Sequence, residues 1–206
     1  MSQGPANFRI LAVSTGNVCR SPMAQAMLTH ALAADLGPAA RAFQVSSAGT
    51  WGHEGSPMEP DAAQVLRERG IVPPSFTARE IAPEHLVVAD LVLVAAVEHR
   101  EVVRAVDPFA ATRTYTLAEF ARYAQMVDPA GLPGDDPVVR ARVLVERVAI
   151  LRHERPLRPR AGDDLADPLG APLHVFRLCG ERLADALASF VRALSPARSS
   201  ADAARS

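Results

Sequence analysis

The sequence has no lysine, only two cysteines and one tryptophan, and aromatic residues make up 5% of its 206 residues. Neither Cys19 nor Cys179 belongs to a C-x-x-C pair, so no zinc site and no disulfide framework is indicated. The formal net charge of −1 provides no global field that would attract nucleic acid or an anionic membrane. Any anion must therefore be bound by local positive charge. Since the chain has no lysine, arginine side chains must supply that charge.

Long hydrophobic runs are also missing. The most apolar stretch, residues 86–97, carries Asp90 and is too short to cross a bilayer. Residues 1–8 lack the basic and apolar regions of a signal peptide. Hydrophobic residues make up 49% and charged residues 22%, which are ordinary values for a globular protein. We therefore expect a soluble, cytoplasmic protein whose length fits one domain.

Short apolar runs alternate with helical patterns along the first part of the chain. This alternation, with short connections, predicts an α/β fold: a single domain with a doubly wound, four-stranded parallel sheet and helices on both faces. Ser21 and Pro22 suit the N-cap and first turn of the first helix. Strands are expected at residues 9–13, 43–47, 90–95 and 113–117, and helices at 23–36, 60–69, 83–88 and 98–106.

Residues 118–164 break the alternation. Helices are expected at 117–124 and 137–151, joined by loops rich in Pro, Gly and Asp and followed by an arginine/proline run. A final amphipathic helix is expected at about 172–194. Residues 195–206 are small and polar and are predicted to be a disordered tail, so the domain is expected to span residues 8–194.

The segment after the first strand, residues 14–21, suits an anion site. Backbone N–H groups of such a loop can converge on one point, and the start of the following helix adds positive potential. Arg20 could hold two phosphate oxygens, Gly16 permits close backbone approach, and Asn17 tolerates a left-handed conformation. An ordinary strand–helix turn with a surface arginine fits these residues equally well.

Residues 13–28, VSTGNVCRSPMAQAML, resemble the signature of the low-molecular-weight protein tyrosine phosphatases: Cys, five residues, Arg, Ser and usually Pro. Ser14 stands where the family carries its nucleophilic cysteine. Similarity continues in the same order over most of residues 8–194, at 45–55, 67–71, 77–81, 89–100 and 164–176. The matching loop positions are Gly16, Asn17, Cys19, Arg20, Ser21 and Pro22.

The resemblance implies phosphomonoester hydrolysis through a covalent phosphocysteine, with an arginine clamp and an aspartic acid as general acid. The catalytic positions would be Ser14, Arg20 and Asp167. Asn17, Ser21 and Ser47 would brace the loop, and Trp51, His53 and Leu169 are possible substrate walls. Phosphate would lie against the loop residues Ser14, Thr15, Gly16, Asn17, Val18, Cys19, Arg20 and Ser21.

Asp167 is one of four aspartates that precede proline. It is preferred as the acid because it lies just before the last helix, as in the family. Asp107, Asp128 and Asp136 are interpreted as turns or helix ends.

Four positions depart from the family pattern. The Ser14 hydroxyl is a much weaker acid than a thiol, and no adjacent base is evident. Phe76 replaces a frequent His, Ala96 a frequent Asp, and Leu169 a frequent aromatic residue, which puts substrate choice in doubt. Cys19 is interpreted as a small buried side chain at a helix start.

The sequence therefore predicts a phosphotyrosine-type hydrolase in which Ser14, as an engineered exchange or a natural variant, leaves weak or no turnover. Two alternatives stay open: a non-catalytic phosphoryl-binding pseudophosphatase, or a different reaction on a phosphorylated metabolite. An arsenate reductase is disfavoured because residues 80–100 contain no cysteine. The expected partners are a phosphorylated protein or small phosphomonoester, with phosphate or another oxyanion in the loop. No cofactor, metal, nucleic acid or membrane is expected.

Overall fold

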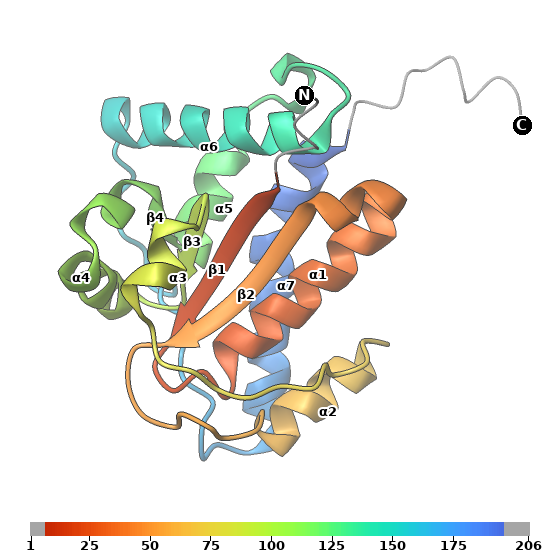
Figure 1. The fold of residues 1–206 in the computed structure, drawn as a ribbon, viewed down its shortest axis with the longest axis vertical. Coiled ribbons are helices and arrows are strands. Elements are labelled where there is room, and N and C mark those ends of the chain that lie inside the picture. Colours follow the sequence, from red (N-terminus) through yellow and green to blue (C-terminus); the bar gives the residue numbers. More distant parts are fainter. Residues whose placement is uncertain (1–6, 196–206) are drawn as a thin grey trace, which may run out of the picture.

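The computed structural model describes residues 7–195, which fold around one sheet (Figure 1). All strand pairs are parallel, and the order across the sheet is β2-β1-β3-β4. The predicted four-stranded parallel sheet is therefore confirmed, with strand ends within two residues of those expected. The strands are β1 Phe8–Ser14, β2 Phe43–Gly49, β3 Leu91–Val94 and β4 Thr114–Thr116.

Seven α-helices and three short 3-10 helices connect and cover the strands of the described chain. The 3-10 helices were not predicted, and two of them carry the chain from a helix into the next strand. The α-helices are α1 Arg20–Leu36, α2 Pro60–Glu68, α3 Pro83–Val87, α4 Val97–Val106, α5 Leu117–Ala124, α6 Pro137–Glu154 and α7 Leu173–Leu194. The 3-10 helices are η1 Gly37–Ala42, η2 Pro108–Arg113 and η3 Pro129–Gly131.

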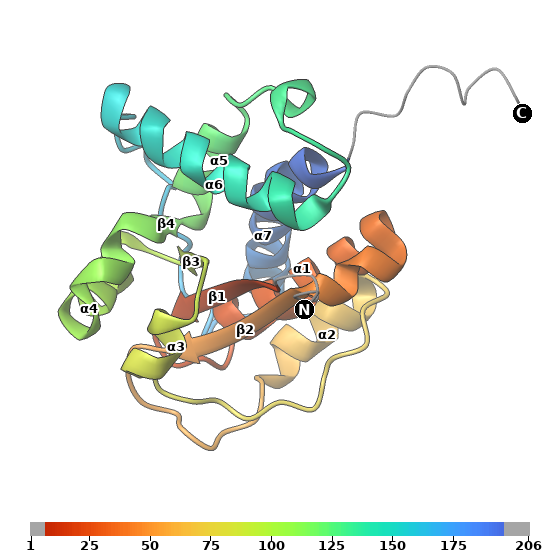
Figure 2. The ribbon, with the colours of Figure 1, turned by 45° about the horizontal axis from the view of Figure 1, so that its top comes forward.

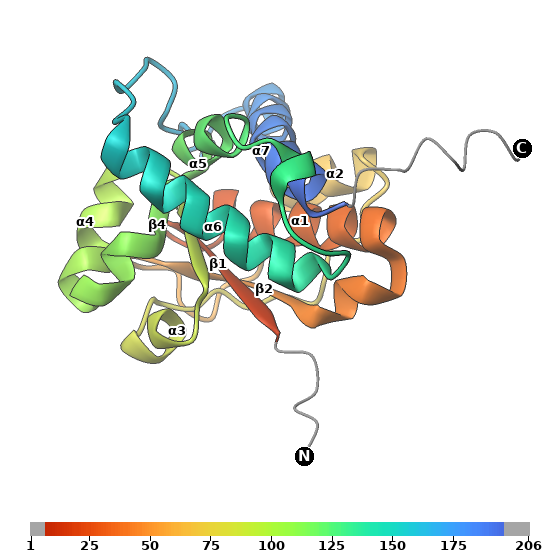
Figure 3. The same cartoon turned by 90° about the horizontal axis from the view of Figure 1, so that it is seen from above.

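Successive side chains of β1 and β3 point to opposite faces of the sheet, and helices cover both faces. Ile10 and Leu93 face the larger core, which α1, α2, α5, α6 and α7 complete. Leu11 and Val92 face a smaller core closed by residues from α3, α4 and η2. Figures 2 and 3 show α7 and α3 on opposite sides of the sheet.

The carboxyl ends of the strands meet at one edge, and the chain leaves the central strand β1 at Ser14. The connections from β1 and β3 run to opposite sides, which makes this edge the ligand crevice of a doubly wound sheet. Neighbouring connections are bonded to β1 there: the Thr50 N–H donates to the Ser14 carbonyl at 2.9 Å, and the Ala95 N–H donates to the Val13 carbonyl at 2.9 Å.

Residues 118–164 form α5 and α6, and Figure 3 shows α6 crossing over the end of the sheet beside α7. Arg140 of α6 is 3% exposed, and its guanidinium donates to the carbonyls of Ala193, Ser195, Pro129 and Leu132. A cation at the carboxyl end of α7 satisfies carbonyls that the helix leaves unpaired. This insertion is therefore fastened to the end of the last helix.

No helix within residues 7–195 combines the length and apolar character needed to cross a membrane. Ser195 follows directly after α7. The rest of the predicted tail, residues 196–206, lies outside the described residues.

Candidate active site

The loop between β1 and α1 positions the candidate site. Helix α1 begins at Arg20 with Cys19 as its N-cap residue, and no side chain caps this helix start. The Arg20 N–H at this helix start can thus serve an anion at the mouth of the loop, whereas the Ser21 N–H faces the Ser14 Oγ at 3.4 Å and Pro22 has no N–H. The prediction that Ser21 is the N-cap was wrong. Its hydroxyl lies 2.7 Å from the Ser14 Oγ instead, beneath the loop.

Asn17 holds the loop in shape. It adopts the expected left-handed conformation, with φ 55°, and its side chain is buried. The Arg79 N–H donates to Asn17 Oδ1 at 3.0 Å, which fixes the orientation of the amide because a backbone N–H can only donate. The Asn17 Nδ2 therefore donates to Ser21 Oγ and Ser47 Oγ, each at 2.9 Å. Asn17, Ser21 and Ser47, which were predicted to brace the loop, lie in one connected network.

This network also reaches Ser14. Ser21 Oγ accepts from Asn17, and its own proton can be donated either to the Ser14 Oγ at 2.7 Å or to the Ala48 carbonyl at 3.4 Å. The Ser21 N–H adds a longer contact of 3.4 Å to the Ser14 Oγ. Ser14 is 2% exposed, and neither a carboxylate nor an imidazole bonds its hydroxyl within residues 7–195. The Ser21 N–H faces the atom at this position, and the Ser21 hydroxyl can donate to it, but no base bonds it.

Arg20 and Asp167 meet over the loop. Arg20 is 4% exposed; its Nη1 donates to the Leu165 carbonyl at 2.9 Å, and its Nη2 forms an ion pair with Asp167 Oδ2. The other oxygen, Asp167 Oδ1, accepts from the Leu169 N–H at 3.2 Å. The side chain of Asp167 is 39% exposed, so this carboxylate can be reached from solvent.

The three competing aspartates have the local roles expected of them. Asp107, Asp128 and Asp136 each accept from the N–H two residues ahead, at 2.9, 3.0 and 2.8 Å, at the start of η2, η3 and α6. Asp167 makes the same turn contact with one oxygen, and the other reaches the guanidinium of Arg20.

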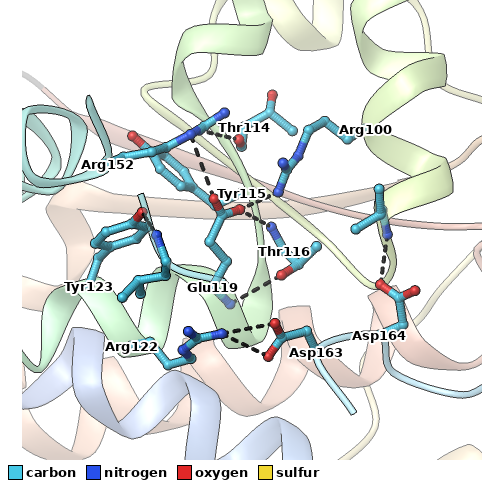
Figure 4. A network of polar contacts seen from close by, with 12 residues as sticks. Arg100, Thr114, Tyr115, Thr116, Glu119, Arg122, Tyr123, Arg152, Asp163 and Asp164 are labelled. Atoms are coloured by element: carbon cyan, nitrogen blue, oxygen red, sulfur yellow. Dashed lines mark hydrogen bonds and ion pairs between the residues drawn. The ribbon is translucent and has the colours of Figure 1, made fainter. Parts of the chain in front are cut away.

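A polar network behind the loop holds the segment that carries Asp167 (Figure 4). Arg122 of α5 donates to both oxygens of Asp163 at 3.2 and 2.9 Å, and Asp164 accepts from the Val97 N–H at 2.8 Å. The Leu165 N–H then donates to the Ala95 carbonyl at 2.8 Å. Three successive residues, which end two positions before Asp167, are thus tied to α5, α4 and the end of β3.

Glu119 ties α5 to two other elements in the same network. It forms ion pairs with Arg100 of α4 and, at 3.6 Å, with Arg152 of α6. Arg152 also lies over the Tyr115 ring, 4.5 Å from its centre, and donates to the Thr114 carbonyl. The helices of residues 118–164, whose role the sequence left open, thus support the Asp167 segment through Arg122 and brace β4.

His99 was missed by the sequence analysis. This residue of α4 is 1% exposed, and its Nε2 lies 3.0 Å from the Thr15 Oγ1. Thr15 Oγ1 also accepts from Arg20 Nη2 at 2.9 Å. Burial, followed by the charge of Arg20, lowers the pKa of His99 below 6.5. A usable signal was present in the sequence, since a histidine four residues beyond a central strand falls at the same sheet edge as the loop.

A pocket of about 140 Å³ opens above the loop. His53 has φ 57° and lies so close to the loop that a Cβ on Gly16 would come within 2.5 Å of His53 Cδ2. Trp51 is 71% exposed and Leu169 41% exposed at the mouth. The residues that line the pocket are Ser14, Thr15, Gly16, Val18, Cys19, Arg20, Trp51, His53, Asp167 and Leu169.

Of the other departures from the family pattern, Phe76 packs against the larger core and Ala96 is the N-cap residue of α4. Neither lines this pocket. Cys19 is 3% exposed; burial, with Asp167 next in importance, raises the pKa of its thiol to about 12. It therefore stays protonated at neutral pH. Larger hollows of about 280 and 460 Å³ lie along α7, but the buried polar residues Ser14, Asn17, Arg20 and Ser21 belong to the loop and the start of α1.

Comparisons with known proteins identify the family of this chain. Residues 9–143 match the profile of the family described as "Low molecular weight phosphotyrosine protein phosphatase". A protein-arginine-phosphatase of Geobacillus stearothermophilus is 29% identical over 176 residues, which cover 85% of this chain and 88% of that protein. Low molecular weight protein-tyrosine phosphatase A of Mycobacterium tuberculosis is 42% identical over 100 residues, 47% of this chain and 58% of that protein.

A solved structure shares the fold as a whole. It is an arginine phosphatase in a Cys-to-Ser mutant form with a phosphorylated active site serine. It superimposes with a TM-score of 0.63 at 22% identity, over 90% of this chain and 94% of that chain. The family profile covers more than half of the chain, including the whole β1–α1 loop. The chain therefore belongs to the low molecular weight phosphotyrosine protein phosphatase family.

Proposed function

We propose that the loop of residues 14–21 binds the phosphoryl group of a phosphorylated protein or a small phosphomonoester, that Arg20 clamps its oxygens, and that Asp167 is the general acid. The observation that carries this proposal is the contact between Arg20 and Asp167. A buried guanidinium and a solvent-accessible carboxylate, 147 residues apart in the sequence, line one pocket above the loop.

The geometry suits displacement at phosphorus. A nucleophile at position 14 attacks phosphorus as the bond to the leaving oxygen breaks, and Asp167 gives that oxygen its proton. Arg20 and the loop N–H groups hold the remaining oxygens while their charge increases. Water, deprotonated by the Asp167 carboxylate, would then release phosphate from position 14.

Ser14 limits this reaction. The Ser21 hydroxyl and N–H would stabilise an anion there, yet an alcohol is far too weak an acid to ionise at neutral pH without a base. A thiol in the same place would ionise readily, because a helix start and a nearby arginine lower a cysteine pKa to about 3.5–7.5. We therefore expect weak or no turnover from the Ser14 chain.

The walls of the pocket favour an aryl phosphate. Trp51 and Leu169 offer apolar surface at the mouth, and the His53 ring lies close to Gly16. A planar phenyl ring fits such a slot, which supports phosphotyrosine as the substrate. Since one relative is a protein-arginine-phosphatase, phosphoarginine is the substrate to test beside it.

The deciding experiment compares the unmodified chain with Ser14→Cys. The Cys variant should hydrolyse p-nitrophenyl phosphate, be inhibited by vanadate, and be inactivated by iodoacetate unless phosphate protects it. The Ser14 chain should show little of this activity. If the Ser14 chain already hydrolyses the substrate rapidly, a serine-based or non-covalent mechanism operates. That result would favour the alternative of a different reaction on a phosphorylated metabolite.

A second candidate function is phosphoryl binding without turnover. It is favoured by Ser14 itself, since every other polar group of the loop is in place. A Ser14→Cys variant that folds and binds phosphate but stays inert would support it. Mass spectrometry of the unmodified chain after incubation with phenyl phosphate would show whether Ser14 traps a phosphoryl group, as the active site serine of the arginine phosphatase mutant did.

A further inference from the structure

The hydroxyl of Thr15 lies between two nitrogen atoms at the rim of the pocket. Arg20 Nη2 is 2.9 Å and His99 Nε2 is 3.0 Å from Thr15 Oγ1. A guanidinium nitrogen can only donate, so the first contact uses a lone pair of the hydroxyl. The direction of the second contact depends on which nitrogen of His99 carries the proton.

The backbone settles this choice. The Ala96 N–H donates to His99 Nδ1 at 3.0 Å, so Nδ1 is the acceptor and the proton of the neutral ring lies on Nε2. Glu98 Oε1 lies 3.6 Å from Nε2, too far for a hydrogen bond but consistent with a proton there. His99 Nε2 therefore donates to Thr15 Oγ1. Burial of the ring and the charge of Arg20 keep the imidazole neutral.

Two donors now occupy both lone pairs of the Thr15 oxygen, so its own proton must be donated elsewhere. Within residues 7–195 no protein group accepts it. Thr15 lines the same pocket as Ser14, Arg20 and Asp167. We propose that Thr15 donates a hydrogen bond to an oxygen of the bound phosphoryl group, and that His99 is the positioning residue that aims this hydroxyl into the pocket.

This inference rests on the proposed phosphoryl-binding function and adds a donor that the loop backbone and Arg20 do not provide. The proposed contact joins two connections at the same edge of the sheet, because His99 belongs to α4 and Thr15 to the loop after β1. Removing the hydroxyl with Thr15→Val should weaken binding of inorganic phosphate about tenfold, the usual effect of losing a hydrogen bond to a charged group. Thr15→Ser should retain binding.

The two hydrogen bonds of His99 can be separated by substitution. Asn at this position can still accept from the Ala96 N–H but is too short to reach Thr15. His99→Asn should therefore weaken phosphate binding several-fold. A role limited to capping α4 would leave the phosphate affinity of His99→Asn unchanged, because Asn retains the contact with the Ala96 N–H.

The chain provides a matched control. His85 caps α3 in the same manner, with the Ala82 N–H donating to His85 Nδ1 at 3.1 Å, and it does not line the pocket. His85→Asn should leave phosphate affinity unchanged. The double variant Thr15→Val/His99→Asn should bind no more weakly than Thr15→Val alone, because His99 acts only through that hydroxyl.

Calorimetric titration with inorganic phosphate tests these variants, with circular dichroism to verify their folding. The inference is overturned if Thr15→Val binds like the parent while Arg20→Ala does not, or if His99→Asn weakens binding equally with and without Thr15. It is also overturned if the effect of Thr15→Val vanishes in an Asp167→Asn background, since the hydroxyl would then serve the acid. If neither Thr15→Val nor Arg20→Ala changes binding, the proposed function itself fails.

Discussion

Asp167→Asn is the variant whose effect follows most directly from the geometry. In the ligand-free protein the Asp167 carboxylate is paired with the guanidinium of Arg20, the group that a phosphate must reach. Binding of a phosphate dianion therefore breaks that pair and brings two anions close together. Asn keeps the size of the side chain and its turn contact with the Leu169 N–H but removes the charge.

The size of the effect follows from exposure. Arg20 is 4% exposed but Asp167 is 39% exposed, so water and salt screen the pair. Pairs of this kind contribute about 0–1 kcal/mol, which corresponds to at most about fivefold in affinity. Asp167→Asn should therefore bind phosphate about two- to fivefold more tightly at neutral pH, and the gain should shrink as salt is added.

The assay is calorimetric titration with phosphate, and Asp128→Asn is the matched control. Asp128 also precedes proline and accepts from the N–H two residues ahead, but it is the N-cap residue of η3 and does not line the pocket above the loop. Its variant should bind like the parent. Weaker binding by Asp167→Asn would refute the reasoning, because it would show that the carboxyl group helps to hold the anion.

Three further predictions concern the loop, its supports and pH. Arg20→Ala should abolish measurable phosphate binding in the same titration, since hydrogen bonds to a charged group contribute about 1.5–3 kcal/mol each. Arg122→Gln should lower the free energy of unfolding by about 1–3 kcal/mol in urea titrations, because Arg122 and Asp163 are 16% and 17% exposed, whereas Arg104→Gln, at an exposed pair with Glu101, should stay within about 0.5 kcal/mol. His99 resists protonation in the folded state because burial lowers its pKa, so the unfolded chain binds the extra proton and stability falls as pH drops below 6.5. His99→Asn should show a smaller loss of melting temperature between about pH 7.5 and about pH 5 than the parent, and an equal loss would assign that slope to other groups.

The sequence predicted the sheet well because its signals are local. Apolar runs bounded by Gly, Pro and Asp define the strands, and the structure moved their ends by at most two residues. The error at Ser21 has a tertiary cause: its hydroxyl is drawn beneath the loop by Ser14 and Asn17 rather than left to cap α1.

The contacts that escaped prediction join segments far apart in the chain. Thr15 and His99 are 84 residues apart, Arg20 reaches a carbonyl 145 residues away, and Arg122 pairs with Asp163 across 41 residues. No local pattern encodes such pairs. The topology does reduce the number of possible residue pairs, since polar residues that follow neighbouring parallel strands lie at the same edge of the sheet.

Phosphoryl affinity and turnover depend on different atoms of this site. The Arg79 N–H fixes the amide of Asn17, Asn17 donates to Ser21, and the Ser21 hydroxyl and N–H lie where they can donate to an anion at position 14. This chain of donors favours negative charge there whether the atom is sulfur or oxygen. With these donors alone, a thiol at position 14 would ionise at neutral pH but a hydroxyl would not. If the proposed function holds, exchange of a nucleophilic cysteine for Ser14 removes the reactive anion and leaves the donors that would bind the charge of the substrate, so we expect this chain to bind phosphoryl groups with little or no turnover.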